Sequence, residues 1–176
     1  MNGPIDAELL GRLLDEHGPA LALYATQWTD AADDCVQESL VELARQAKPP
    51  EHAVAWLYRV VKNRALNAAR GERRRKERES RATADRFAAT QQSSAFDRSD
   101  AVATSDALVQ LDQAERELVV MRIWGGLTFD EIAVALAIST STAHRQYERA
   151  LTKLRTILES PCSTNTSPQT IGPAQR

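Results

Sequence analysis

The fold of the chain is decided by residues 127–155, which read LTFDEIAVALAISTSTAHRQYERALTKLR. Thr128 and Glu131 have the spacing of a capping box, which predicts that a helix begins there. The apolar face of this helix recurs at i, i+3, i+4 and i+7, in Phe129, Ile132, Ala133 and Leu136. Residues 137–139 form the predicted turn, and Ser139 can cap a second helix. The stretch therefore predicts a helix-turn-helix, whose spacing suits the major groove of DNA.

The second helix of this stretch has two faces of different character. One face is an apolar stripe that we expect to be buried, made of Ala143, Tyr147, Ala150, Leu151, Leu154 and Leu158. The other face carries hydroxyls and charges, in Ser141, Thr142, Arg145, Glu148, Arg149 and Thr152. Hydroxyl and guanidinium groups on an exposed helix face suit phosphates and base edges. An ordinary helical hairpin with a solvated charged face is the alternative that this stretch alone leaves open.

The composition of the 176 residues favours helices and argues against several classes of protein. Only 7 glycines and 7 prolines interrupt a chain dominated by alanine, leucine, arginine and glutamate, so we expect an all-α fold. No apolar run is long enough to cross a membrane and no signal peptide opens the chain, so we expect no membrane partner and a cytoplasmic location. Cys35 and Cys162 lack metal-ligand spacing and are expected to be reduced thiols. No catalytic or metal-binding set assembles, so we expect neither enzyme activity nor a cofactor.

Charge is distributed unevenly along the chain, although the net charge is only −2. Residues 1–51 hold 3 basic and 10 acidic side chains, net −7, whereas residues 52–81 hold 10 basic and 3 acidic, net +7. This asymmetry suggests one surface for nucleic acid and another for a basic or polar protein partner.

Three helices are predicted in the N-terminal half. The first spans residues 6–28 with a break near Gly18, and the second begins near Asp30. The second helix should end by Lys48, because a proline disfavours the helical conformation of the residue before it. The third helix continues through the arginine run that ends near residue 81.

The third helix also separates into an apolar and a basic side. Its expected core face consists of Ala53, Trp56, Leu57, Val60 and Val61. Trp56 lies on that face and is interpreted as packing, whereas Tyr58 lies off it and is the better candidate for stacking on a base. The basic side chains are either a solvated helix end or a phosphate-binding face, and each phosphate that they neutralise would release counterions.

Residues 82–104 lose helical periodicity and are rich in alanine, serine, threonine and glutamine, which predicts a flexible linker. Helices are then expected over residues 106–111 and 113–124, and Gly125-Gly126 should end the second of them. The chain thus divides into a helical domain of residues 1–81, a linker of residues 82–104, a helix-turn-helix domain of residues 105–159 and a tail of residues 160–176 that is expected to be disordered.

Three stretches resemble the motifs of bacterial RNA polymerase sigma factors. Residues 32–38, ADDCVQE, resemble the AEDxVQE motif of sigma region 2, and residues 56–65, WLYRVVKNRA, resemble the WLYRIARNxA stretch that follows it. Residues 111–155 resemble sigma region 4, including its GLTFDEIA and STSTAHR pieces. Their order around a linker is similar to that of small, two-domain sigma factors of the extracytoplasmic-function group. The resemblance covers nearly all of residues 6–158.

The resemblance implies a promoter-specificity subunit that binds core RNA polymerase and promoter DNA. Region 2 would dock on the polymerase through an acidic and polar helix face, made of Asp33, Asp34, Gln37, Glu38 and Val41. The promoter element near the start site would be contacted and opened by His52, Tyr58, Arg59, Lys62, Asn63, Asn67, Arg70 and Arg73. Region 4 would read the more distant element in the major groove with Thr140, Ser141, Thr142, His144, Arg145, Glu148 and Arg149. The sequence leaves open whether an anti-sigma factor is a further partner.

Two features depart from the family pattern. The resemblance implies that residues 48–53 hold an unstacked base. The segment of residues 48–54 lacks the aromatic and Gly-Asp residues that are frequent there, so the identity of that base stays open. Ala137 stands where the turn often has glycine, and a left-handed alanine costs about 1 kcal/mol, so the turn could differ in detail.

Two other functions compete with the promoter-specificity subunit. A stand-alone helix-turn-helix regulator should carry a sensing or dimerisation domain, and none is evident. A helical adaptor protein would account for the acidic N-terminal part but not for Arg145 and Arg149.

Overall fold

The computed structural model describes residues 5–82 and 107–159, with no side chains described for residues 79–82. The predicted tail, Cys162 and the predicted linker beyond Ala82 lie outside the described residues. Every regular element within the two described ranges is an α-helix, which confirms the all-α prediction for them. None of the described helices is long and apolar enough to span a membrane.

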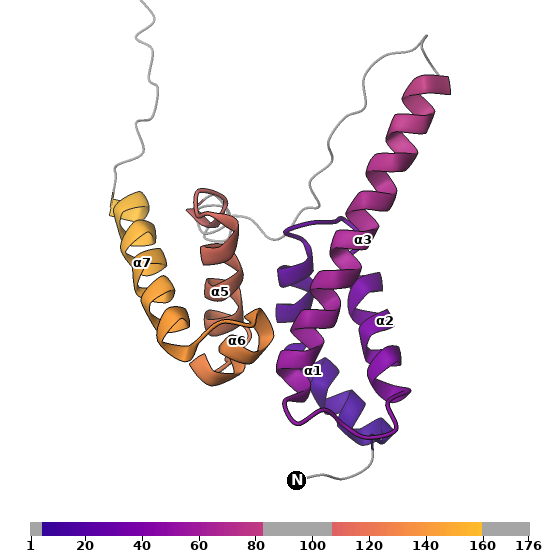
Figure 1. The fold of residues 1–176 in the computed structure, drawn as a ribbon, viewed down its shortest axis with the longest axis horizontal. Coiled ribbons are helices and arrows are strands. Elements are labelled where there is room, and N and C mark those ends of the chain that lie inside the picture. Colours follow the sequence, from indigo (N-terminus) through magenta and orange to yellow (C-terminus); the bar gives the residue numbers. More distant parts are fainter. Residues whose placement is uncertain (1–4, 83–106, 160–176) are drawn as a thin grey trace, which may run out of the picture.

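The N-terminal range folds into three helices that lie side by side: α1 (Ala7–Ala25), α2 (Ala32–Ala44) and α3 (Ala53–Ala82). Helix α3 is much the longest, and its C-terminal end projects beyond the other two (Figure 1). The predicted break near Gly18 is wrong, because α1 is one helix with Pro19 inside it. Proline removes the backbone hydrogen bond to Asp15, but Asp15 is exposed and water can satisfy its carbonyl. Leu21 and Tyr24 are fully buried and hold the turns that follow.

The C-terminal range contains α5 (Gln113–Ile123), α6 (Phe129–Leu136) and α7 (Thr140–Glu159), preceded by one helical turn at residues 107–109. The predicted capping box of α6 is present with both of its hydrogen bonds, between Thr128 and Glu131. The predicted cap of α7 is confirmed as well, because the Thr142 backbone N–H donates to Ser139 Oγ at 3.2 Å. Helices α6 and α7 and their tight turn therefore form the expected helix-turn-helix.

The turn after α6 and the turn between α5 and α6 each contain a residue in the left-handed conformation. Ala137 ends α6 with φ 56° and ψ 44°, so the alanine adopts the conformation for which glycine is usual. Between α5 and α6, Gly126 has φ 67°, whereas Gly125 is needed for space: an added Cβ would lie 2.3 Å from the Tyr58 hydroxyl and 2.6 Å from the Met121 carbonyl oxygen.

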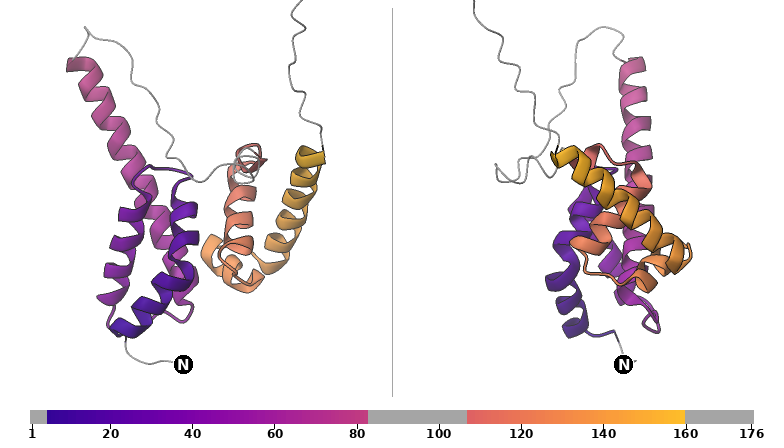
Figure 2. Two further views of the ribbon diagram at one scale, coloured as in Figure 1. Left: turned by 180° about the vertical axis from the view of Figure 1, so that it is seen from behind. Right: turned by 90° about the vertical axis from the view of Figure 1, so that its left-hand side faces the viewer.

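The two helical groups pack against each other. Helix α6 lies against α3 and α5 lies against α1, as the two further views also show (Figure 2). One cluster of buried residues is continuous across both groups, and it includes Tyr24, Tyr58, Leu118, Met121 and Ile132. A smaller cluster around Val119 and Ala150 joins α5 to α7. The free chain therefore places its two helical groups in direct contact, a point that the sequence left open.

Candidate nucleic-acid and protein interfaces

The N-terminal half of α7 presents the predicted recognition residues to solvent. Six of the seven are exposed and one, Thr142, is half-buried. The helix packs through Ala143 and Ala150, which are fully buried, together with Tyr147 and Leu154. The prediction that Leu151 and Leu158 are buried is wrong, since 38% and 62% of their surfaces are exposed. These two leucines lie at the edge of the apolar stripe, and the partner helices cover only its centre.

Hydrogen bonds orient the first turn of α7. Ser139 Oγ lies 3.1 Å from Ser141 Oγ and 2.7 Å from Thr142 Oγ1. Thr140 Oγ1 donates to Asp130 Oδ1 at 2.8 Å, which ties α7 to the first turn of α6. Three hydroxyls are thus held in one network at the N-terminal end of the helix, and the fourth, that of Thr140, is held by Asp130. Backbone N–H groups are also unpaired at this end of a helix and favour anions.

Farther along α7, aromatic packing restrains a second recognition residue. The His144 ring packs against Phe129 with 4.8 Å between centroids, and His144 Nδ1 lies 3.5 Å from Glu148 Oε1. Arg145 and Arg149 are exposed, and neither makes an ion pair with any described residue. Their guanidinium groups can therefore bind a groove edge or a phosphate without first breaking an internal contact.

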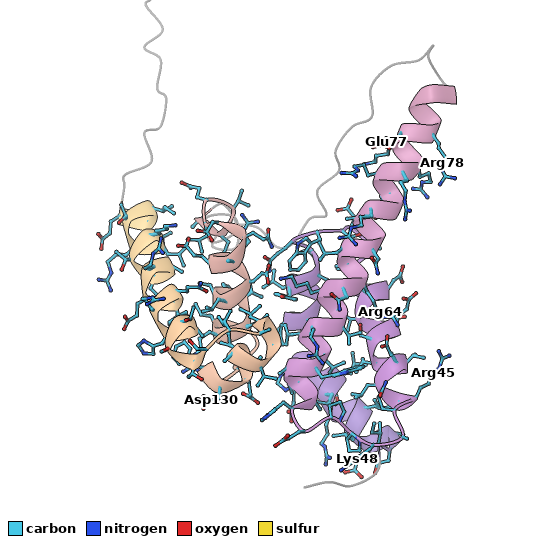
Figure 3. All side chains as sticks on the ribbon, viewed as in Figure 1. Arg45, Lys48, Arg64, Glu77, Arg78 and Asp130 are labelled. Atoms are coloured by element: carbon cyan, nitrogen blue, oxygen red, sulfur yellow. The ribbon has the colours of Figure 1, made fainter. Side chains whose placement is uncertain are left out.

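Most of the predicted proximal-element residues are accessible. Six residues of this set have exposed side chains: His52, Arg59, Asn63, Asn67, Arg70 and Arg73. The five on α3 are spaced by three or four residues, so they share one side of that helix. The side chains of Glu77 and Arg78 extend from the projecting end of the same helix (Figure 3).

The prediction that Tyr58 is available for stacking is wrong for this conformation. Tyr58 is fully buried, its ring lies 5.0 Å from that of Tyr24, and its hydroxyl abuts Gly125. Burial raises the pKa of Tyr58 well above its ordinary value. The helical periodicity of the sequence indicates only the face of α3 that packs on α1 and α2. Helix α6 packs on a second face of α3. Trp56, expected in the core, is only half-buried.

Lys62 is half-buried because of a residue that the sequence did not single out. Glu117 of α5 is 4% exposed, and its Oε2 lies 2.7 Å from Lys62 Nζ. The Tyr24 hydroxyl donates to the same oxygen at 3.0 Å. The pKa of Tyr24 lies far above its ordinary value, mainly because the side chain is buried and also because the Glu117 carboxylate is close. The Tyr24 hydroxyl therefore remains a donor. The Lys62 ammonium also lies 5.7 Å from the Trp28 ring centroid.

The predicted protein-docking face lies along α2. Asp33, Asp34, Gln37 and Glu38 are exposed, and Val41 is an apolar residue with 49% of its surface exposed. Arg64 of α3 pairs with Glu38 and Glu42 together, and so joins α2 to α3 at this face (Figure 3).

A groove of about 500 Å³ between α1 and α2 borders the same face. Its apolar lining comes from Leu14, Pro19, Ala22 and Val36, and its polar rim from Asp15, Asp33 and Gln37. An apolar floor with an acidic rim can accept the aliphatic stem and the charged head of a basic side chain.

Comparison with known proteins assigns both helical groups. Residues 13–75 match the family model described as Sigma-70 region 2, and residues 107–156 match Sigma-70 region 4. No curated protein matches the chain in a sequence search. Among solved structures, CnrH in complex with the cytosolic domain of CnrY is similar with 24% identity and a TM-score of 0.58, over 89% of this chain and 92% of that chain. The sigma factor RpoE, in complex with the anti-sigma factor NepR from Bartonella quintana, is similar with 20% identity and a TM-score of 0.58, over 89% and 99%.

The chain belongs to the sigma-70 family of RNA polymerase sigma factors, and it carries regions 2 and 4 of that family. The solved relatives share its fold at low sequence identity. Its function is promoter-specific transcription initiation with core RNA polymerase, as the resemblance implied. Region 2 comprises α1–α3 and region 4 comprises α5–α7.

Proposed function

We propose that region 4 reads the distal promoter element through the N-terminal half of α7. The observation that carries this proposal is the pair Arg145 and Arg149, which lie one helical turn apart on an exposed face of a capped helix. An arginine that binds a guanine through two hydrogen bonds typically gives about 1–3 kcal/mol of discrimination against a wrong base. The hydroxyls of Thr140, Ser141 and Thr142 supply phosphate contacts that set the register of α7 on the duplex.

Region 2 binds two partners through two surfaces of opposite charge. The acidic α2 face, from Asp33 to Val41, docks on core RNA polymerase. The apolar lining of the groove beside it packs against the aliphatic stem of a basic side chain of the polymerase. The exposed basic side of α3, from Arg59 to Arg73, contacts the proximal promoter element. Its positive charge attracts the DNA backbone and makes binding dependent on salt.

The proposal also covers the location, the chemistry and the regulation of the protein. The protein acts in the cytoplasm by binding alone and contributes no catalytic step or cofactor to initiation. An anti-sigma factor is proposed as a regulator, because a solved relative of similar fold is held by one.

Transcription in vitro tests the assignment of regions 2 and 4 to these partners. Core RNA polymerase, the protein and genomic fragments of the host should give discrete transcripts that need the protein. Variants of the α2 face should lose the protein's binding to polymerase, and variants of α7 should lose promoter choice while polymerase binding persists. DNA binding without polymerase and without new transcripts would contradict the proposal and favour a stand-alone regulator.

A further inference from the structure

Region 2 and region 4 meet at a charge pair that is largely removed from solvent. Lys62 Nζ and Glu117 Oε2 are separated by 2.7 Å, and the two partners are 55 positions apart in the sequence. The lysine side chain is 33% exposed and the glutamate side chain 5%. A second bond across the same boundary, from Gln113 Nε2 to Gln27 Oε1, measures 2.9 Å. Removing the charge of one partner would leave the other ion without a partner in the packed arrangement, so such a change disfavours that arrangement.

The partner that Glu117 provides resembles a DNA phosphate in its chemistry. A carboxylate and a phosphodiester each offer an anionic oxygen to an ammonium group. Lys62 lies in the set of α3 residues assigned above to the proximal promoter element, and its side chain pairs with a carboxylate of region 4. The exposed members, such as Arg59 and Asn63, remain accessible in the packed arrangement.

We propose that Glu117 occupies, in the free protein, the position on Lys62 that a promoter phosphate takes when the two regions separate. Packing of region 4 on region 2 and DNA binding by Lys62 then compete for the same ammonium group. This inference rests on the proposed role of α3 in DNA binding. The packed state also buries Tyr58 against Gly125, so separation exposes an aromatic ring at the same place.

Competition of this kind lowers the DNA affinity of the free protein. The apparent DNA affinity is the affinity of the separated state multiplied by the fraction of molecules in which the regions are separated. Glu117→Gln removes the charge while keeping the size of the side chain and an oxygen that can accept from Tyr24. Lys62 then loses its anion, so the separated state gains population and DNA binding by the free protein should strengthen by about tenfold.

The experiment compares the full-length wild-type chain with Glu117→Gln and a matched control. The control is Glu115→Gln, which removes another 4% exposed carboxylate from α5 that also pairs with a lysine, Lys153, but within region 4. Small-angle X-ray scattering gives the radius of gyration of each free protein. Fluorescence anisotropy with a short duplex of mixed sequence gives DNA affinity, which needs no knowledge of the promoter because the phosphate contact is independent of sequence. Circular dichroism establishes that each variant is folded.

The expected result is a larger radius and about tenfold tighter DNA binding for Glu117→Gln, with neither change in Glu115→Gln. A compact Glu117→Gln with wild-type DNA affinity would overturn the inference. An expanded variant with unchanged affinity would overturn the competition for Lys62. If Glu117→Gln does not fold, Tyr24→Phe replaces it. Losing the hydroxyl donor leaves the buried Glu117 carboxylate with one hydrogen bond fewer in the packed arrangement, so both readouts should change in the same direction. Failure of the wild type to support promoter-specific transcription would instead refute the proposed function, whatever the scattering shows.

Discussion

Thr140 Oγ1 and Asp130 Oδ1 lie 2.8 Å apart in a hydrogen bond that joins the first turns of α7 and α6. Asp130 stands at the outer end of the helix-turn-helix, where its side chain is exposed (Figure 3). With the Ser139 cap, this bond gives the two helices of the motif a second connection besides the turn itself. The angle between α7 and α6 is therefore set in part by this bond.

Thr140→Val should lower the free energy of unfolding by about 0.5–1.5 kcal/mol, the usual net contribution of one hydrogen bond. Valine keeps the shape and the branched Cβ of threonine but cannot donate to Asp130. Thr140→Ser keeps the donor and serves as the control. Urea denaturation measures both variants, and equal stabilities for the valine and serine variants would show that the bond contributes nothing.

Ala137→Gly should stabilise the helix-turn-helix by about 1 kcal/mol, because alanine at φ 56° carries a steric cost that glycine avoids. For a chain of this size, that is a rise of about 2–4 °C in Tm. The matched variant is Gly126→Ala, at φ 67°, which should shift the Tm downward by a similar amount. Opposite signs for the two variants are the expected pattern in calorimetry, and a fall in Tm for Ala137→Gly would contradict the assignment of left-handed strain.

Local signals in the sequence predicted local structure well. The capping box at Thr128 and the Ser139 cap act within a few residues, and α6 and α7 begin where those signals lie. Helix α2 ends at Ala44, before the predicted limit at Lys48. The same holds for the exposure of Arg145 and Arg149, because helical periodicity alone separates them from the buried stripe. The left-handed turn at Ala137 shows the limit of residue preference, since the chain adopts there a conformation that alanine disfavours.

Contacts between distant residues could not be predicted in the same way. The sequence places Tyr58 on a free face of its helix, because nothing in that helix indicates that the distant turn at Gly125 packs against it. Glu117 had no distinguishing pattern either, since its partners Tyr24 and Lys62 are far from it in sequence. One sign was present: Glu117 stands beside three apolar residues, Leu118, Val119 and Val120, in a helix with apolar residues on several sides. An acidic residue there has to find a partner.

The two central tyrosines should respond in opposite directions to loss of the hydroxyl group. Tyr58 has a buried hydroxyl without a hydrogen-bond partner among the described residues, so Tyr58→Phe should raise the free energy of unfolding by about 1 kcal/mol. Tyr24 donates to Glu117, so Tyr24→Phe should lower it by about 1 kcal/mol or more. Denaturant unfolding of both variants checks the signs. A destabilised Tyr58→Phe would show that its hydroxyl has a partner.

Glu38→Gln should weaken binding to core RNA polymerase more than Glu42→Gln does. Each variant removes one carboxylate from the Arg64 guanidinium, so each disturbs the connection between α2 and α3 similarly. Only Glu38 belongs to the proposed docking face, where loss of one interfacial charge contact is expected to cost about 1–3 kcal/mol, roughly 5- to 150-fold in Kd. Surface plasmon resonance with immobilised core enzyme measures the difference. Equal affinities would move the docking face away from α2.

Arg145→Ala combined with Arg149→Ala should abolish promoter selectivity while leaving polymerase affinity unchanged. Each lost bidentate contact is expected to remove about 1–3 kcal/mol of discrimination between bases. Arg155→Ala, farther along α7, provides a control that removes an exposed positive charge outside the recognition half. Transcripts initiated at the wild-type positions by the double variant would show that α7 does not read the distal element.

The most direct measurement is run-off transcription with purified core RNA polymerase on fragmented genomic DNA of the host, with and without the protein. We expect discrete transcripts that appear only when the protein is present and that share two upstream sequence elements. These transcripts should disappear with the Arg145 and Arg149 double variant. Transcripts that are the same with and without the protein, despite its binding to DNA, would contradict the account.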